Sequence, residues 1–153
     1  MPKDTSLWNP PVLFHFKVEF QWTDNSRTSA SFAEVDGLGH DLVFSGSSKT
    51  DDRFPGFPTD VKVEDVVLKR SLEPLDEKIS QWVTTCFDFL NTGWIEPCRV
   101  IITLLDGESK IAACWTCLHA IPVKWKLNPL NASESKIAIE SITLKHTKLI
   151  RSR

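Results

Sequence analysis

The feature that most constrains the fold is an alternation of apolar and polar residues within positions 13–22, strict from Phe14 onward. Phe14, Phe16, Val18, Phe20 and Trp22 alternate with polar or charged side chains. Successive side chains along a strand point to opposite faces of a sheet, so the pattern predicts a strand with one buried and one hydrated face. Such half-buried strands are typical of antiparallel sheets. We therefore expect a mainly β fold.

Similar apolar segments recur along the chain, separated by turn residues. The Asp106-Gly107 dipeptide is a strong hairpin signal, because it adopts positive φ at little cost. Together with the first strand, the patterns predict strands over residues 30–35, 42–44, 61–72, 99–105, 110–119, 121–127 and 136–148.

One segment has helical periodicity. Over residues 75–91, apolar side chains recur at spacings of three and four, which predicts an amphipathic helix. Pro74 suits the first turn of this helix, and Gly93 suits its C-terminal stop. The apolar positions are Ile79, Trp82, Val83, Cys86, Phe87 and Leu90. These patterns predict a single domain over residues 1–153, a small antiparallel β-barrel or sandwich with one flanking α-helix.

Two segments suggest contacts beyond the domain itself. Residues 45–60 are polar and rich in proline and glycine, and long loops in compact domains are often functional. In the last predicted strand, Ile137 and Ile139 face one side, and Ala138, Ile142 and Leu144 face the other. A strand that is apolar on both faces needs two covers. The core supplies one cover, and the helix or a neighbouring subunit supplies the other.

The charge balance excludes several classes of protein. A formal net charge of -2 argues against a nucleic-acid binder with a basic surface. We interpret the C-terminal basic cluster of Lys145, Lys148, Arg151 and Arg153 as a solvated tail. No segment approaches the roughly 20 apolar residues of a membrane helix, and no signal-peptide pattern is present. We expect assembly in the cytoplasm, without direct membrane insertion by this chain.

One pattern raises the alternative of a zinc module: Cys114-Trp-Thr-Cys117, followed by His119. Paired zinc ligands usually lie on turns, whereas this pair falls in a predicted strand, where positions i and i+3 point to opposite faces. Cys117 and His119 share a face, but Cys86 and Cys98 form no second pair. Buried free thiols are the preferred interpretation.

Other motifs of catalysis or cofactor binding are absent from the sequence. The sequence contains no Gly-x-Ser-x-Gly elbow, dinucleotide-binding fingerprint or Walker pattern, and Gly37 and Gly39 are interpreted as a turn. Phe14, Phe16 and Phe20 are interpreted as core residues, because base-stacking proteins combine aromatic residues with a basic groove. We therefore expect neither an enzyme nor a cofactor. A monomeric ligand-binding barrel is a further alternative, although no polar anchor set is present.

Several segments, in order, resemble the contractile tail tube family of phage tails and extracellular contractile injection systems, which includes the Hcp-like proteins. Those that carry the resemblance are Phe14-His-Phe-Lys-Val-Glu-Phe20, Phe32-Ala-Glu-Val-Asp-Gly-Leu38, Val67-Leu-Lys-Arg-Ser-Leu72, residues 100–106, Trp115, Ala120-Ile-Pro-Val-Lys-Trp125, Leu130-Asn-Ala132, Ile137-Ala-Ile-Glu140 and Leu144-Lys-His146. Each segment alone is weak, but the ordered set spans nearly the whole chain.

The resemblance implies a structural protein whose six copies form a ring around a central channel, with rings stacking into an inner tube. It implies sheath protein, baseplate proteins, and a tape-measure protein or cargo in the channel as partners, within a phage-tail-like particle. The loop after the third strand would contact the adjacent ring through Ser45, Lys49, Asp51, Asp52, Arg53, Phe54 and Phe57. The last strand would contact the neighbouring subunit through Ile137, Ile139, Ile142 and Leu144.

The chain departs from the family pattern over residues 51–64, where proline and aspartate are frequent. Because this loop determines what a ring stacks on, a second role is possible within the same family. The chain could form the initiator ring that joins the inner tube to the baseplate, instead of the body of the tube.

Overall fold

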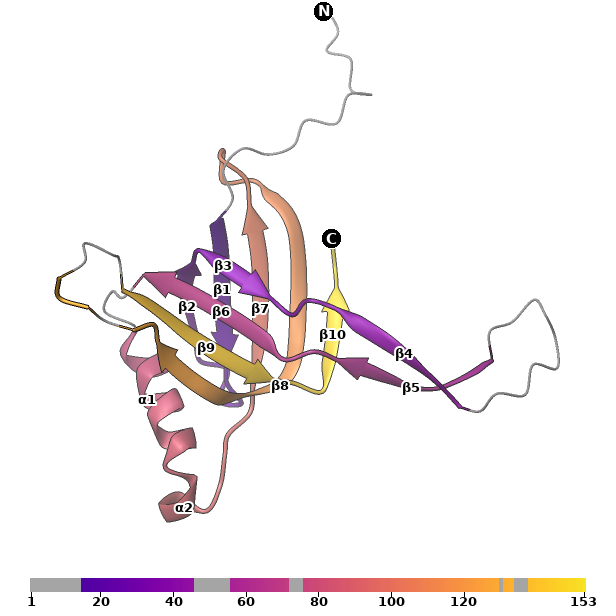
Figure 1. The fold of residues 1–153 in the computed structure, drawn as a ribbon, viewed down its shortest axis with the longest axis horizontal. Coiled ribbons are helices and arrows are strands. Elements are labelled where there is room, and N and C mark those ends of the chain that lie inside the picture. The colour runs from indigo at the N-terminus through magenta and orange to yellow at the C-terminus, as the bar shows by residue number, and fades with distance from the viewer. Residues whose placement is uncertain (1–14, 46–55, 72–75, 130, 134–137) are drawn as a thin grey trace, which may run out of the picture.

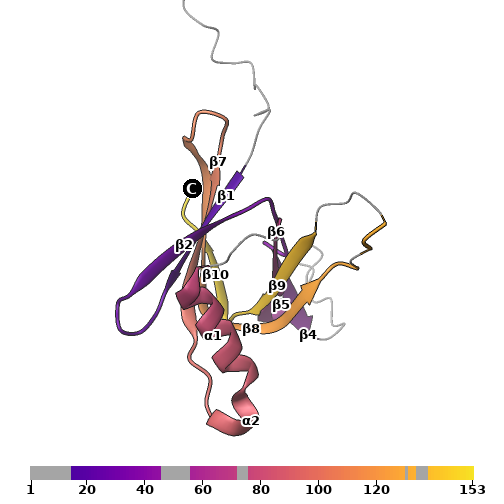
Figure 2. The same cartoon turned by 90° about the vertical axis from the view of Figure 1, so that its left-hand side faces the viewer.

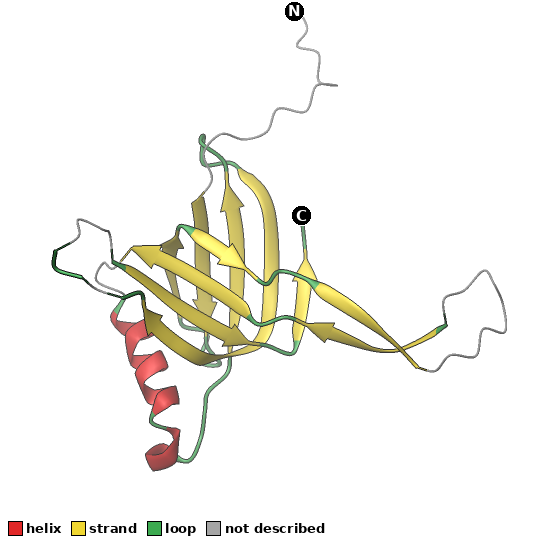
Figure 3. Cartoon of the chain, viewed as in Figure 1, coloured by secondary structure: helices red, strands yellow, loops and turns green. Residues whose placement is uncertain are grey.

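The computed structural model describes residues 15–45, 56–71, 76–129, 131–133 and 138–153. These residues form antiparallel strands and two short consecutive helices on one side (Figures 1 and 3). In chain order the elements are β1 (His15–Gln21), β2 (Arg27–Phe32), β3 (Glu34–Asp36), β4 (His40–Ser45), β5 (Phe57–Val63), β6 (Val66–Ser71), α1 (Glu77–Phe87), α2 (Phe89–Thr92), β7 (Cys98–Leu105), β8 (Ile111–Leu127), β9 (Ile139–Lys145) and β10 (Lys148–Arg151).

The main sheet curves back on itself through β8. Its strand order is β2-β1-β7-β8-β9-β6-β3, with β10 paired to β8 beside this path. The first part of the 17-residue β8 pairs with β7 and the second part with β9. The strand changes direction near His119, whose φ is 53°. One continuous strand therefore belongs to both halves of the sheet, which cross in Figure 2.

The segment of β2 and β3 closes the sheet into a barrel. β2 pairs with β1 at one edge, and β3 pairs with β6 at the other. Between them, the Ala33 amide donates a hydrogen bond to the Lys69 carbonyl at 2.9 Å. The two ends of the strand order, β2 and β3, are therefore joined directly and do not form two separate open edges.

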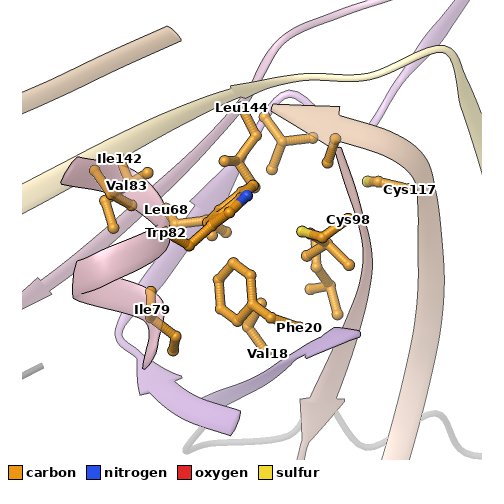
Figure 4. Packing of buried hydrophobic residues seen from close by; sticks show 14 of the residues in the cluster. Val18, Phe20, Leu68, Ile79, Trp82, Val83, Cys98, Cys117, Ile142 and Leu144 are labelled. Carbon is orange, nitrogen blue, oxygen red and sulfur yellow. The ribbon is translucent and has the colours of Figure 1, made fainter. Parts of the chain in front are cut away.

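The core confirms the alternation in the first strand. Val18 and Phe20 are fully buried and Trp22 nearly so, whereas Phe16 packs against the core from its margin and Phe14 lies outside the described residues. Side chains from both halves of the sheet meet those of α1 in one cluster (Figure 4). The fully buried members are Phe20, Phe32, Leu68, Ile79, Ile102, Ile142, Leu144, Val18, Val66, Val100 and Cys117.

Helix α1 packs on the open end of this core. Its N-cap is Asp76, whose carboxylate accepts a hydrogen bond from the Lys78 amide at 2.8 Å. Trp82 lies edge-on to Trp22, with ring centroids 6.0 Å apart, and donates from its indole nitrogen to the Glu96 carbonyl at 2.7 Å. Gly93 ends α2 with φ of 77°, which confirms the predicted C-terminal stop.

Several predicted boundaries are wrong. The strand predicted over 61–72 is two strands, β5 and β6, because the chain turns a corner at Glu64 and Asp65. The two strands predicted over 110–119 and 121–127 are the single β8. The helix begins at Glu77, and Pro74 lies outside the described residues.

The end of the chain also differs from the prediction. The last strand breaks after Lys145, and Lys148–Arg151 form β10, which pairs with Trp115–Leu118 of β8. The Arg151 guanidinium lies 5.8 Å from the Trp115 ring centroid. Lys145, Lys148 and Arg151 are thus strand residues with exposed side chains. The segment is not a free tail, because Leu149 inserts into the core.

Candidate assembly surfaces

The β4–β5 hairpin projects from the barrel at one end of its longest axis (Figure 1). It forms a separate two-stranded sheet, in which Leu42 pairs with Val61 and a bulge falls between Val43 and Phe44. Large apolar side chains are unusually exposed on it: Phe57 at 78%, Leu42 at 58%, Val61 at 52% and Phe44 at 42%. Contiguous exposed apolar residues on a soluble protein mark interaction sites. We call this group the hairpin surface.

The base of the hairpin is held firmly by the barrel. The Nε2 atom of His40 donates to the Leu149 carbonyl of β10 at 2.8 Å, and Nε2 of the buried His146 donates to the Glu64 carbonyl at 2.9 Å. Gly37 (φ 88°) passes so close to the Asp65 carbonyl oxygen that a Cβ there would lie 2.0 Å from it. The interpretation of Gly37 and Gly39 as a turn is confirmed, and the turn also fixes where the hairpin leaves the barrel.

Two of the residues predicted to contact an adjacent ring, Ser45 and Phe57, lie at the ends of β4 and β5 in this hairpin. Phe57 is the most exposed large apolar residue of the hairpin surface, and Ser45 pairs with it across the strands. The remaining predicted residues, Lys49, Asp51, Asp52, Arg53 and Phe54, lie outside the described residues. The contact with an adjacent ring stays a prediction.

The strand predicted to contact a neighbouring subunit is mostly internal. Ile142 and Leu144 are 1% and 0% exposed and belong to the core, whereas Ile139 is half-buried and Ile137 lies outside the described residues. The core therefore covers the face of this strand that carries Ile142 and Leu144. Its contact with a neighbouring copy stays a prediction, and these two side chains are unavailable for it.

A second exposed apolar surface, not predicted from the sequence, lies where α1 ends. We call it the helix-end surface and define it by Phe87 of α1 and Trp125 of β8, which are exposed and line one cleft. Exposed apolar side chains on neighbouring segments are Phe89, Leu90, Trp94, Val123 and Leu127. Phe87 and Leu90 were expected on the buried face of the helix, but they are 49% and 94% exposed. For Leu90 the prediction fails because the helix breaks at Asp88, and α2, which follows, has no buried residues. Phe87 is the last residue of α1 and lies outside its buried face, which is formed by Ile79, Trp82, Val83 and Cys86. A break at Asp88 was the available signal, since aspartate disfavours helix interiors.

A cleft joins the two elements that form the helix-end surface. It is lined by Thr84, Thr85, Phe87, Asp88, Thr92 and Trp125. The Trp125 indole nitrogen donates to Oε1 of Glu140 at 2.5 Å, which fixes the ring beside the helix. Glu140 is 3% exposed, and its Oε2 has no hydrogen-bond partner among the described residues. Leaving a buried carboxylate oxygen without a donor is costly, so this pair is a point of strain at the surface.

The structure places the cysteines and histidines of the possible zinc module. Among the described residues, no group of three or more histidine, cysteine or acidic side chains could hold a metal ion. The prediction that Cys117 and His119 share a face is wrong: the β7–β8 register shifts here, Cys117 is buried, and the exposed His119 contacts Thr147 at 2.9 Å. Cys86 and Cys98 are also buried and Cys114 is half-buried, all as free thiols.

Burial makes the thiols of Cys86, Cys98 and Cys117 poor ligands and nucleophiles at neutral pH. Desolvation raises the pKa of Cys98, and it raises the pKa of Cys117 from 9.0 to about 12. The pKa of Cys86 is also raised, chiefly by desolvation. Metal binding and nucleophilic attack require the thiolate, which these environments oppose.

The raised thiol pKa values predict a loss of stability in alkaline solution. Above pH 9.0 the unfolded thiols ionise while the folded Cys98 and Cys117 keep their protons, so the unfolded state binds fewer protons. The free energy of unfolding should therefore fall by up to about 1.4 kcal/mol per pH unit for each thiol. Urea unfolding from about pH 8 to about pH 11 measures this slope. The double variant Cys98→Ala, Cys117→Ala should flatten it; an unchanged slope would contradict the assignment.

The described helices are too short and too polar to cross a membrane. The fold is similar to solved chains of contractile injection particles. A chain of the baseplate of the anti-feeding prophage matches with a TM-score of 0.75 and 22% identity, over 95% of this chain and 97% of that one. A chain of the anti-feeding prophage cap matches with a TM-score of 0.68 and 18% identity, over 97% and 95%.

A chain from the sheath–tube complex of the extracellular contractile injection system PVC matches with a TM-score of 0.66 and 19% identity, over 94% of this chain and 91% of that one. At these identities the structural matches establish the fold. Among curated proteins, no sequence matches this chain. Residues 12–150 match the family model of the T4-like virus tail tube protein gp19. The chain therefore belongs to the gp19 tail tube family, a family of structural proteins and not of enzymes.

Proposed function

We propose that this protein is a subunit of the inner tube of a phage-tail-like contractile injection particle, and that six copies form a ring that stacks around a central channel. The family membership supports a role in a tail tube. The main structural support for assembly is the exposed apolar surface of the projecting hairpin. A separate two-stranded hairpin with exposed apolar side chains is marginal by itself in water. A neighbouring copy that covers these apolar side chains would stabilise the hairpin.

The similar structures indicate the partners. The matched chains come from a sheath–tube complex, a baseplate and a tube-terminating cap, so we propose that sheath and baseplate proteins contact this protein too. The channel would hold a tape-measure protein or cargo. Assembly would take place in the cytoplasm, before the tube becomes part of the finished particle.

A second role has its own support. The TM-score to the baseplate chain is 0.75, against 0.66 for the chain from the sheath–tube complex. This difference favours an initiator ring between the inner tube and the baseplate as the alternative. Locating the protein in intact particles separates the two roles: many stacked copies indicate the tube, and one ring at the baseplate indicates the initiator.

Electron microscopy of the purified protein tests the proposal. We expect hexameric rings, some of them stacked, whereas a dispersed monomer at high concentration would contradict the proposed function. Phe57→Asp places a charge on the most exposed apolar side chain of the hairpin surface. It should leave single rings intact and shorten or abolish stacks, because a charge resists burial between rings. Ile111→Asp, at a position 48% exposed outside both surfaces, is the matched control.

A further inference from the structure

We infer that a cavity at one end of the barrel binds a small oxyanion, a phosphate or a carboxylate, through Arg99, Asn25 and His119. The cavity has a volume of about 300 Å³ and lies where the β1–β2 turn, the start of β7 and the bend of β8 meet. Among the described residues, no acidic side chain lines it. The inference does not depend on the proposed ring, because one chain supplies all three of these residues.

A bulge in the sheet places Arg99 at the centre of this cavity. In the pairing of β7 with β8, Arg99 alone lies opposite two residues, Leu118 and His119, because the register shifts there. On its other side, Arg99 pairs with Gln21 of β1. Bulges re-aim side chains, and they are common at barrel rims and beside functional sites. The irregular pairing therefore brings a guanidinium and an imidazole to one point of the rim.

The guanidinium of Arg99 and the amide of Asn25 are available to a ligand. Arg99 is exposed, and neither side chain makes a hydrogen bond or ion pair with any described residue. A guanidinium binds the oxygens of carboxylates and phosphates through paired N–H donors. The side-chain amide adds two further donors. Both groups line the same cavity, so one oxyanion could accept from both.

The carboxylates that contact the lining residues are bound by other donors. The Gln21 amide donates to Oε1 of Glu19 at 2.9 Å, and the Thr23 hydroxyl donates to Oε1 of Glu96 at 2.8 Å. Neither Glu19 nor Glu96 lines the cavity. The positive charge of Arg99 is therefore not neutralised by an ion pair within the described part of the chain.

Two of the lining residues have a backbone conformation that favours glycine. The φ of Asn25 is 66° and that of His119 is 53°. Glycine adopts such angles at the lowest cost, whereas both positions here have polar side chains that line the cavity. Residues held in the left-handed region cluster at ligand sites. The choice of asparagine and histidine at these positions supports a binding role.

Thr147 fixes the orientation of the His119 ring. The Thr147 hydroxyl donates to the Leu118 carbonyl at 3.2 Å, so its oxygen accepts from Nδ1 of His119 at 2.9 Å. The other ring nitrogen, Nε2, makes no hydrogen bond with the described residues. With Nδ1 protonated, Nε2 donates to an anion only when the imidazole is in its cationic form.

Binding of the anion should therefore strengthen in mildly acidic solution. The charged and titratable groups around His119 are Arg99 and the neutral thiol of Cys98 in the cavity, and Lys148 of β10, which pairs with the adjacent Leu118. The two cations oppose a further positive charge on the imidazole. A bound anion offsets that repulsion, so protonation of His119 and anion binding favour each other.

Equilibrium dialysis with radiolabelled sulfate tests the site on the full chain, whatever its oligomeric state. Sulfate keeps its charge between about pH 6 and about pH 8, so a change in its binding over this range reports on the protein. We expect saturable binding of one sulfate per chain, stronger at the lower pH. Displacement by phosphate identifies a phosphate site, and displacement by succinate identifies a carboxylate site. Succinamide, the uncharged analogue of succinate, should displace nothing.

Four full-length variants locate the binding. Arg99→Gln should weaken it by about tenfold or more, because a hydrogen bond to a charged group is lost. Arg151→Gln removes the same charge from an exposed arginine outside the cavity and should bind as the wild type does. Asn25→Gly keeps the turn and should weaken binding, and His119→Asn, which also tolerates positive φ, should abolish the pH dependence. Circular dichroism checks that each variant is folded.

The outcomes separate this inference from the proposed function. Absence of sulfate binding to the wild type at both pH values would overturn the inference, as would failure of both phosphate and succinate to compete. Equal affinities of Arg99→Gln and Arg151→Gln would also overturn it, and binding independent of pH would remove His119 from the site. A protein that binds sulfate in the expected way but forms no rings would contradict the proposed function alone.

Discussion

Replacing Gly37 with alanine is expected to destabilise the fold severely. The new Cβ would lie 2.0 Å from the Asp65 carbonyl oxygen and 3.0 Å from its carbon, and both belong to backbone that cannot rotate away. The φ of 88° adds a further cost for any residue with a side chain. The clash can be relieved only if the β3–β4 connection moves away from the corner between β5 and β6. We expect a loss of more than about 4 kcal/mol, a large part of the stability of a single domain.

Gly93→Ala is the matched control for this substitution. Its φ of 77° is also positive, but a Cβ there would meet no atom within 4 Å. It should therefore cost only about 1 kcal/mol, the conformational penalty alone. Urea unfolding of both variants gives the comparison. Similar losses for the two glycines would show that the close approach to Asp65 is unimportant.

Trp82→Ala should produce the second large effect, a loss of about 3–5 kcal/mol. The indole is 6% exposed, its ring centroid lies 5.8 Å from that of Phe20, and its nitrogen donates to the Glu96 carbonyl at 2.7 Å. Truncation opens a cavity beneath α1 and leaves that carbonyl without its donor. The helix would then keep only Ile79, Val83 and Cys86 as buried contacts with the core.

Trp94→Ala provides the comparison, because it removes the same side chain from a position that is 57% exposed. Its effect on the free energy of unfolding should stay within about 1 kcal/mol. Thermal unfolding followed by circular dichroism measures both variants. If Trp82→Ala cost no more than Trp94→Ala, the indole would not anchor the helix.

The periodic parts of the fold could be predicted from the sequence, because burial imposes periodicity. The alternation in the first strand correctly identified Val18, Phe20 and Trp22 as buried, and the helical spacing identified Ile79 and Trp82. The boundaries were harder. The bend of β8 at His119 has no local signature, and neither has the return of the chain at Lys148 to pair with β8.

The surface residues were harder still, for a different physical reason. An apolar residue that awaits a partner has the same side chain as one that is already buried. Phe87 and Leu90 continue the spacing of the helix, and Ile142 and Leu144 could equally have faced a neighbour. Exposed fractions separate the two cases, since they place the first pair on the surface and the second in the core.

The hydrogen bonds at the base of the hairpin have a mechanical consequence. His40 joins β4 to the Leu149 carbonyl of β10, and β10 is paired with β8. A force on the hairpin is therefore transmitted from β4 to β10 and from β10 to β8, the strand that belongs to both halves of the sheet. In a tail tube, a load on the hairpin of this subunit would therefore pass to the barrel through β10 and β8.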